Sequence, residues 1–237
     1  MIRILICLIA LSWAGTATAD AEPPVLRFVC TIPADSPVFS AGEQLYREAM
    51  HSLGYGFEME FRPTRRAQVD LRAGRYDGDC GRVQAFAAPA LKMPVVRVDV
   101  QLAMVEAVAM THEQRLLAMP REQLIAEGLR FGYIKGNLSV EQEITQITGI
   151  IAVGLNSPAQ GLKMLSSGRI DLLIFPQVLM ESALMKAQTT TPRIWGAWQR
   201  YPLYPYLHTR HQSLAPALAK SLNQRLTAPD NPVAPFQ

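Results

Sequence analysis

The order of apolar and polar positions along the chain predicts alternating strands and helices. Residues 26–30 form a short apolar run, and residues 57–61 alternate apolar with polar side chains, as a half-buried strand does. Between them Leu45, Ala49 and Leu53 recur every four positions, which places them on one face of a helix. We predict strands over residues 26–30, 57–61, 76–80, 95–110 (one strand or a pair), 129–134, 150–153, 170–175, 194–198 and 206–209, and helices over residues 40–53, 64–74, 119–127, 139–148, 158–168, 176–186 and 214–226.

One joint between a helix and a strand occurs twice. Leu71-Arg-Ala-Gly-Arg-Tyr-Asp77 and Leu165-Ser-Ser-Gly-Arg-Ile-Asp171 share the pattern Leu-x-x-Gly-Arg-x-Asp. A glycine just past a helix end adopts a left-handed backbone without a Cβ penalty, so each copy should end a helix and lead into a strand. The repetition predicts two α/β lobes of similar construction. The alternative is a chance match between two ordinary helix ends.

The alternation up to residue 80 is the unit of a doubly wound parallel sheet, and it restarts near residue 129. A final strand and helix are left over, and such a tail often returns to the first lobe. We therefore predict an α/β fold whose two lobes are mostly parallel sheets flanked by helices. Lobe one should comprise residues 24–108 and 206–237, and lobe two residues 109–205. We expect residues 106–111 and the segment near Tyr204 to cross between the lobes as a hinge.

The first residues have the features of a secretory signal peptide. Arg3 precedes an apolar run that is too short to span a bilayer, and small residues follow at positions 17–19. We predict a signal peptide over residues 1–19, with cleavage after Ala21 as the alternative, and an exported, periplasmic monomer. The formal net charge is only +3 and the basic residues are scattered, so we expect no nucleic-acid partner.

Two cysteines remain beyond the predicted signal peptide, Cys30 and Cys80. Both lie near the carboxyl ends of predicted strands, the first and the third of the chain, which are usually neighbours in a doubly wound sheet. Adjacent strands are about 4.8 Å apart, a spacing that a disulfide tolerates. We predict a Cys30–Cys80 disulfide, the alternative being two reduced, buried thiols.

The sequence offers little for catalysis. It contains no Gly-x-Ser-x-Gly, phosphate-binding or dinucleotide motif, and no Cys-x-x-Cys. His208 and His211 are three apart on an expected strand, which turns their rings to opposite faces. With four histidines in all, a zinc site is not expected. We expect no enzyme activity, no metal and no cofactor.

Several short motifs resemble one family. Arg66 with Asp77-Gly-Asp-Cys-Gly-Arg82, and Tyr206-Leu-His-Thr-Arg-His211 with Leu214, resemble a divergent subgroup of periplasmic solute-binding proteins of the amino-acid-uptake type (family 3 extracellular solute-binding proteins). The resemblance covers nearly all of the chain after residue 19. It implies a two-lobed, type II periplasmic-binding-protein-like fold that holds a small-molecule ligand between its lobes and performs no chemistry. It further implies delivery of the solute to an ABC-type permease or, as the alternative, presentation to a membrane receptor or kinase by a soluble sensor.

Ligands of open α/β sheets lie beyond the carboxyl ends of the strands, where helix N-termini favour anions. The candidate ligand-binding residues at these places are Ser36, Arg65, Arg66, Asp79, Arg82, Glu106, Lys135, Asn137, Ser139, Phe175 and Gln177. In the amino-acid-binding relatives an acid for the ligand's ammonium stands about four residues after the second-lobe Asp, and here that position is Phe175. We therefore expect an acid-bearing organic solute, bound mainly through Arg82, and weak binding of ordinary amino acids.

Simpler interpretations of these candidates stay open. Arg82 can instead form a local ion pair with Asp79 or Asp77. Arg65 and Arg66 cannot both face a cleft, so one should face solvent. Residues 135–139 can be only a turn and a helix cap.

Overall fold

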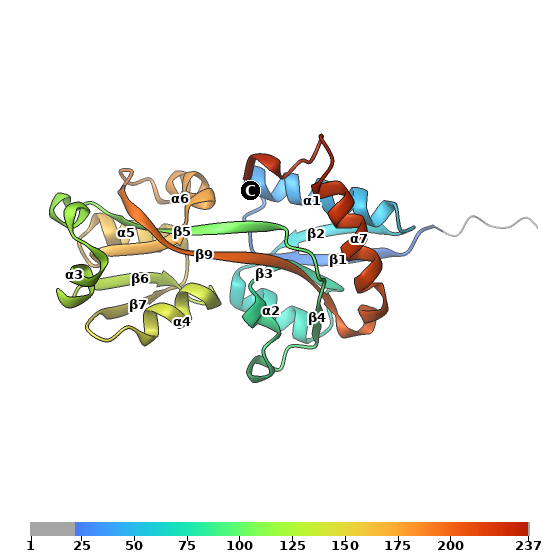
Figure 1. Cartoon of the computed structure of the whole chain (residues 1–237), viewed down its shortest axis with the longest axis horizontal. Helices are drawn as coiled ribbons and strands as arrows, with labels where there is room; N and C mark the ends of the chain where they lie inside the picture. The colour runs from blue at the N-terminus through green and yellow to red at the C-terminus, as the bar shows by residue number, and fades with distance from the viewer. Residues whose placement is uncertain (1–21, 237) are drawn as a thin grey trace, which may run out of the picture.

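The computed structural model describes residues 22–236, so the predicted signal peptide over residues 1–19 lies outside the described residues. Strands and helices alternate through most of the chain (Figure 1). The strands are β1 Val25–Cys30, β2 Gly56–Phe61, β3 Gly78–Arg82, β4 Val95–Arg97, β5 Ala103–Thr111, β6 Arg130–Ile134, β7 Ile151–Leu155, β8 Leu172–Pro176 and β9 Arg193–His208. The helices are α1 Pro37–His51, α2 Thr64–Arg72, α3 Arg121–Ala126, α4 Leu138–Gln146, α5 Pro158–Ser166, α6 Met180–Ala187 and α7 Ala215–Leu226.

The strands form two parallel groups joined by two long antiparallel strands. Their order is β2-β1-β3-β9-β5-β8-β6-β7, and β4 also pairs with β9. In one lobe β1 runs parallel to β2 and β3, and in the other β6 runs parallel to β7 and β8. β5 and β9 run side by side from one lobe into the other (Figure 1). The predicted α/β fold with two lobes is confirmed.

Both repeated joints end a helix as the sequence predicts. Gly74 after α2 has φ 70° and Gly168 after α5 has φ 64°, both in the left-handed region that favours glycine. The amide of Gly74 donates to the carbonyl of Leu71, and the amide of Gly168 donates to the carbonyl of Leu165. The two joints are therefore the same structure as well as the same sequence.

The aspartate at the end of each joint ties the joint to the first strand of its own lobe. The backbone amide of Arg27 in β1 donates to Oδ2 of Asp77 at 2.9 Å. The backbone amide of Arg130 in β6 donates to Oδ2 of Asp171 at 2.7 Å. Hydrogen bonds to an ionised acceptor are stronger than neutral ones, so each carboxylate fixes where a helix re-enters its sheet.

One predicted boundary is wrong. The sequence predicts two strands separated by a connector around Pro202 and Pro205, whereas β9 runs without a break through both prolines. Proline lacks the N–H that a ladder needs, yet Pro202 lies within the pairing of β9 with β5, opposite Met104. β3 pairs with β9 only from Tyr204 to Leu207, so Pro202 lies beyond that pairing. The carbonyl of Pro205 accepts from Val98 in the turn between β4 and β5.

The strands cross between the lobes over residues 103–106 of β5 and 200–203 of β9, which pair with each other. On one side of this crossing β9 pairs with β3, and on the other β5 pairs with β8. The crossing thus lies slightly before the predicted segment 106–111, most of which is already paired to β8.

The last helix packs on the first lobe. Leu218 and Leu222 of α7 share one buried cluster with Phe28 of β1 and Leu45 of α1. Separate clusters fill the second lobe on the two faces of its sheet, around Phe131 and Leu173. The helices of residues 22–236 include none that is both long enough and apolar enough to cross a bilayer.

Candidate functional site

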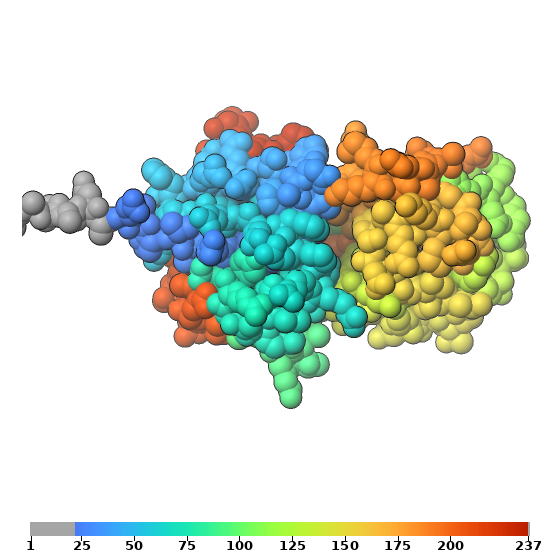
Figure 2. All heavy atoms as spheres, turned by 180° about the vertical axis from the view of Figure 1, so that it is seen from behind, coloured from blue at the N-terminus to red at the C-terminus, as the bar shows by residue number. Residues whose placement is uncertain are grey.

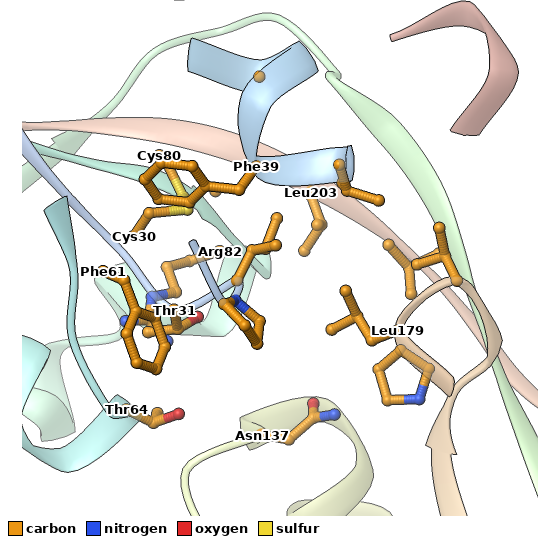
Figure 3. A pocket seen from close by; sticks show the side chains of 18 of the residues that line it. Cys30, Thr31, Phe39, Phe61, Thr64, Cys80, Arg82, Asn137, Leu179 and Leu203 are labelled. Atoms are coloured by element: carbon orange, nitrogen blue, oxygen red, sulfur yellow. A yellow bond between two sulfur atoms is a disulfide. The ribbon is translucent and has the colours of Figure 1, made fainter. Parts of the chain in front are cut away.

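A cavity of about 430 Å³ lies between the two lobes, and both contribute its walls. Thr31, Phe39, Phe61, Thr64 and Arg82 line it from lobe one, and Asn137 and Leu179 from lobe two, with Leu203 of the crossing strand between them (Figure 3). Figure 2 shows the groove between the lobes from behind, bridged where the loop before α1 (blue) meets α6 (orange). A volume of this size is typical of a site for a small organic ligand.

A disulfide joins two strands at the lobe-one wall of this cleft. Cys30 and Cys80 are bonded, with their Cα atoms 5.1 Å apart, and both line the cavity. The pairing was predicted because β1 and β3 should be neighbours, and Val29 of β1 does lie opposite Asp79 of β3. The hydroxyl of Tyr46 donates to the carbonyl of Cys80 at 2.6 Å, which ties α1 to the same strand end.

Arg82 at the end of β3 is buried and ion-paired, but one of its guanidinium nitrogens has no hydrogen-bond partner among the described residues. Its Nε donates to Oδ2 of Asp79 at 2.8 Å, with 9% of the arginine side chain and 0% of the aspartate side chain exposed. Its Nη2 is buried and has no hydrogen-bond partner among the described residues. Arg82 lines the cavity together with Thr31 and Phe61 (Figure 3), and its guanidinium carbon lies 5.1 Å from the centre of the Phe86 ring. Arg82 thus forms a local ion pair with Asp79, and its side chain also lines the cleft.

Asp79 behaves as a support for Arg82. Burial raises the pKa of Asp79, while the charge of Arg82 and hydrogen bonds from Gly81 and Arg82 pull it back toward its usual value. The amide of Gly81 donates to Oδ1 at 3.1 Å, so both carboxylate oxygens are engaged. A carboxylate held in this way fixes the arginine head in one orientation.

Four helices begin at the cleft. Val38 of α1, Thr64 of α2, Leu138 of α4 and Pro158 of α5 are all in the first turns of their helices and all line the cavity. A helix N-terminus carries a partial positive charge and N–H groups without partners in the helix. These ends therefore bring partial positive charge to the cleft, while Asp79 balances the charge of Arg82.

The lobes also touch through an ion pair. Nζ of Lys186 in α6 donates to Oδ1 of Asp35 in the loop before α1, at 2.9 Å. The hydrogen bond from Lys186 holds the pKa of Asp35 below its usual value. On another side of the cleft, a Cβ on Gly136 would lie 2.6 Å from Thr64 of the opposite lobe. The lobes are therefore in contact around the cleft.

Three of the predicted site residues line this cavity, namely Arg82, Asn137 and Phe175. The others do not: Ser36, Arg65, Arg66, Asp79, Glu106, Lys135, Ser139 and Gln177. Asp79 acts through Arg82, as described above, and the remaining seven have other positions.

In lobe one these positions are structural or exposed. Ser36 is buried and caps α1, its hydroxyl accepting from the amide of Val38 at 3.3 Å. Arg65 is exposed, and Arg66 donates to Asp70 one helical turn away, at 3.1 Å. Both arginines follow the second strand as predicted, but α2 turns them away from the cleft and presents its first residue, Thr64, instead.

In lobe two and the crossing strands the outcome is similar. Asn137, not Ser139, is the residue that precedes α4, so Ser139 is already inside the first turn. Gln177 is exposed, and the side chain of Lys135 lies against the position of Gly154. Glu106 pairs with Arg200 of the neighbouring strand. By contrast Phe175 is only 4% exposed and forms part of the cleft wall.

Sequence patterns did not reveal several lining residues. Val233 and Phe236 lie in a Pro-rich tail that has no periodicity, and Lys186 falls in a helix without any motif. Gly42 lines the cleft from the interior of α1. A glycine inside a strongly helical pattern was the one available signal, because it weakens a helix unless the space is needed.

Comparisons with known proteins agree with this geometry. No protein-family model matches the chain. An uncharacterized protein of Shewanella oneidensis is 26% identical over 206 residues, which is 86% of this chain and 77% of that protein.

Solved structures of similar shape are more numerous. Holo ArgBP from T. maritima is 14% identical with a TM-score of 0.68, over 87% of this chain and 92% of that one. The periplasmic VFT2 domain of Bordetella pertussis BvgS is 14% identical with a TM-score of 0.68, over 90% and 92%. The chain has the type II periplasmic-binding-protein fold. The ancestral amino acid-binding protein AncCDT-1, a precursor of cyclohexadienyl dehydratase, is also similar, 14% identical with a TM-score of 0.68 over 88% and 91%.

Proposed function

We propose that this protein is a periplasmic solute-binding protein. It captures a small, acid-bearing organic solute between its two lobes and delivers it to the permease of an ABC transporter. The observation that carries the proposal is the buried Nη2 of Arg82, which has no partner among the described residues and belongs to a side chain that lines the cleft.

The surroundings of Arg82 favour an acid group on the ligand. Asp79 already balances the charge of Arg82, so a ligand carboxylate needs further positive character nearby. The first turns of four helices supply it, since their N-terminal ends favour anions. Asn137 adds an amide side chain from the opposite lobe.

The cleft is equipped for binding more than for proton transfer. Among the described residues that line it there is no Asp, Glu or His, and the charged side chains are Arg82 and Lys186. His, Glu and Asp are the side chains that most often act as general acids and bases, so the lining lacks the commonest groups for proton transfer. The same composition offers no carboxylate for the ammonium of an amino acid, which supports a ligand without a positive charge.

Capture requires that the ligand bind the closed form more tightly than the open form. The pair Asp35–Lys186 and the contact of Gly136 with Thr64 form only when the lobes are together. We propose that β5 and β9 flex at residues 103–106 and 200–203, and that these contacts hold the closed form once ligand is inside. Small-angle scattering should therefore show a smaller radius of gyration with a bound solute than without it, and an equal radius would contradict closure.

The test of the binding site is a screen followed by calorimetry. Organic acids, amino acids and sugars are first compared by their effect on the melting temperature, and the best solute is then titrated. The double variant Asp79→Asn/Arg82→Gln removes both buried charges together, so it should fold but lose affinity by about 2–5 kcal/mol. Arg47→Gln, an exposed arginine of α1 outside the cleft, is the matched control. Unchanged affinity in the double variant would remove Arg82 from the site.

A membrane sensor is the alternative receiver of the closed form. The similarity to a periplasmic domain of BvgS is as strong as the similarity to ArgBP, with a TM-score of 0.68 for each. Uptake of labelled solute separates the two. Cells that lack this protein should lose uptake if it serves a permease and keep uptake if it serves a sensor.

A further inference from the structure

One end of the cleft is apolar and is built partly by the end of the chain. After α7 the chain returns to α1, and a short turn, Ala234–Phe236, lies on the side of α1 that faces lobe two (Figure 1). Val233 and Phe236 from this segment line the same cavity as Val38 and Phe39 of α1. Residues 231–236 are called the C-terminal turn below.

Hydrogen bonds hold the C-terminal turn in place. Asn231 is buried, and its Nδ2 donates to the carbonyl of Leu226 at the end of α7, at 3.0 Å. Its Oδ1 accepts from the amide of Val233 at 3.0 Å, and the amide of Phe236 donates to the carbonyl of Val233 at 2.9 Å. These bonds tie the backbone that carries both lining side chains to the end of α7.

Gly42 also leaves room in this cavity. It lies inside α1 and lines the cavity, and a Cβ added there would meet no atom within 4 Å. Glycine in a helix interior destabilises the helix relative to alanine. Gly42 therefore does not contribute to the stability of α1. Its effect is to widen the cleft between α1 and lobe two.

We propose that Gly42, Val233 and Phe236 form an apolar subsite, and that the ligand is a monocarboxylate with an apolar body of several carbon atoms. The acid group binds at Arg82 and the body lies along α1 against the C-terminal turn. This inference rests on the proposed function and specifies its ligand. Phe175, which stands where an amino-acid-binding relative would carry an acid, offers no carboxylate to a cationic group on the same body.

The test is calorimetry with straight-chain monocarboxylates from acetate to octanoate. Burying a methylene is worth about 0.8 kcal/mol, so affinity should rise roughly fourfold per added carbon until the subsite is full. Gly42→Leu fills the subsite, so the affinity should stop increasing at a carboxylate with fewer carbon atoms. Phe236→Ala should reduce the increase in affinity for each added carbon atom. Ala234→Ser, exposed in the same turn and outside the cavity lining, should leave the series unchanged.

The outcomes separate the subsite from the function. Affinity that does not depend on chain length, or the same dependence in Gly42→Leu as in the unchanged protein, overturns the subsite. If such acids still bind and the Asp79→Asn/Arg82→Gln variant loses them, the proposed function survives that result. If a solute of another class binds and no monocarboxylate does, the ligand class proposed here is wrong. Absence of binding by every class tested defeats both proposals.

Discussion

The buried pair Asp79–Arg82 gives the sharpest test of how the site is built. We expect Arg82→Met to destabilise the protein by about 3–5 kcal/mol, because it leaves the carboxylate of Asp79 buried without its counter-charge. Solvent cannot reduce this cost by much, since 0% of the Asp79 side chain and 9% of the Arg82 side chain are exposed. Replacing both residues, as Asp79→Asn/Arg82→Met, should cost clearly less, because no uncompensated charge remains.

The loss of unfolding free energy in Arg82→Met, called its deficit below, should also depend on pH. Burial raises the pKa of Asp79, and the charge and hydrogen bond of Arg82 lower it, so the pKa rises further in Arg82→Met. A carboxylate with a raised folded-state pKa adds stability that is full below its unfolded pKa and lost as the pH rises through the folded pKa. The deficit of Arg82→Met should therefore be larger at pH 7 than near pH 4, where Asp79 of the variant becomes protonated.

Urea unfolding at both pH values measures these differences, provided that the slope against urea is the same in all variants. Arg66→Met is a useful control. Arg66 also pairs with an aspartate, but its side chain is 62% exposed and Asp70 keeps Arg75 as a second partner, so the loss should be small. Equal losses in Arg82→Met and in the double variant, or a deficit that is the same at both pH values, would refute the reasoning.

Two further predictions concern links between neighbouring strands, one at the cleft and one at the opposite ends of the lobe-two strands. Replacing both Cys30 and Cys80 by alanine should lower the free energy of unfolding by up to about 4 kcal/mol, since the disulfide closes a loop with a sequence separation of 50; unfolding curves that coincide with those of the oxidised protein would contradict this. Asp171→Asn should cost about 1–3 kcal/mol at pH 7, because it weakens the tie from Arg130 to the repeated joint. Burial raises the pKa of Asp171, but the hydrogen bonds from Arg130 outweigh it and hold the pKa below its usual value. This contribution is present above the unfolded pKa and is lost as the pH falls through the folded one, so the deficit of Asp171→Asn should shrink in acid.

The sequence alone determined the features that depend on local structure. The glycines of the two Leu-x-x-Gly-Arg-x-Asp joints end their helices as predicted, because a left-handed turn is a property of a few neighbouring residues. The alternation of strands and helices implied neighbouring first and third strands, and from this the Cys30–Cys80 disulfide followed. The sequence also placed Arg82 at the carboxyl end of the third strand, and this end of β3 does line the cleft.

Only the tertiary structure decided what depends on residues far apart in the sequence. Pro202 and Pro205 suggested a connector, but pairing with β5 on one side and with β3 further along makes β9 a single strand. The sequence left open whether Arg65 or Arg66 faces the cleft, and the direction of α2 decided that Arg66 pairs with Asp70. The C-terminal turn has no periodic pattern at all, and its place in the cleft follows from the packing of α7 on α1. Such contacts depend on how whole elements pack, and short-range sequence patterns carry no record of them.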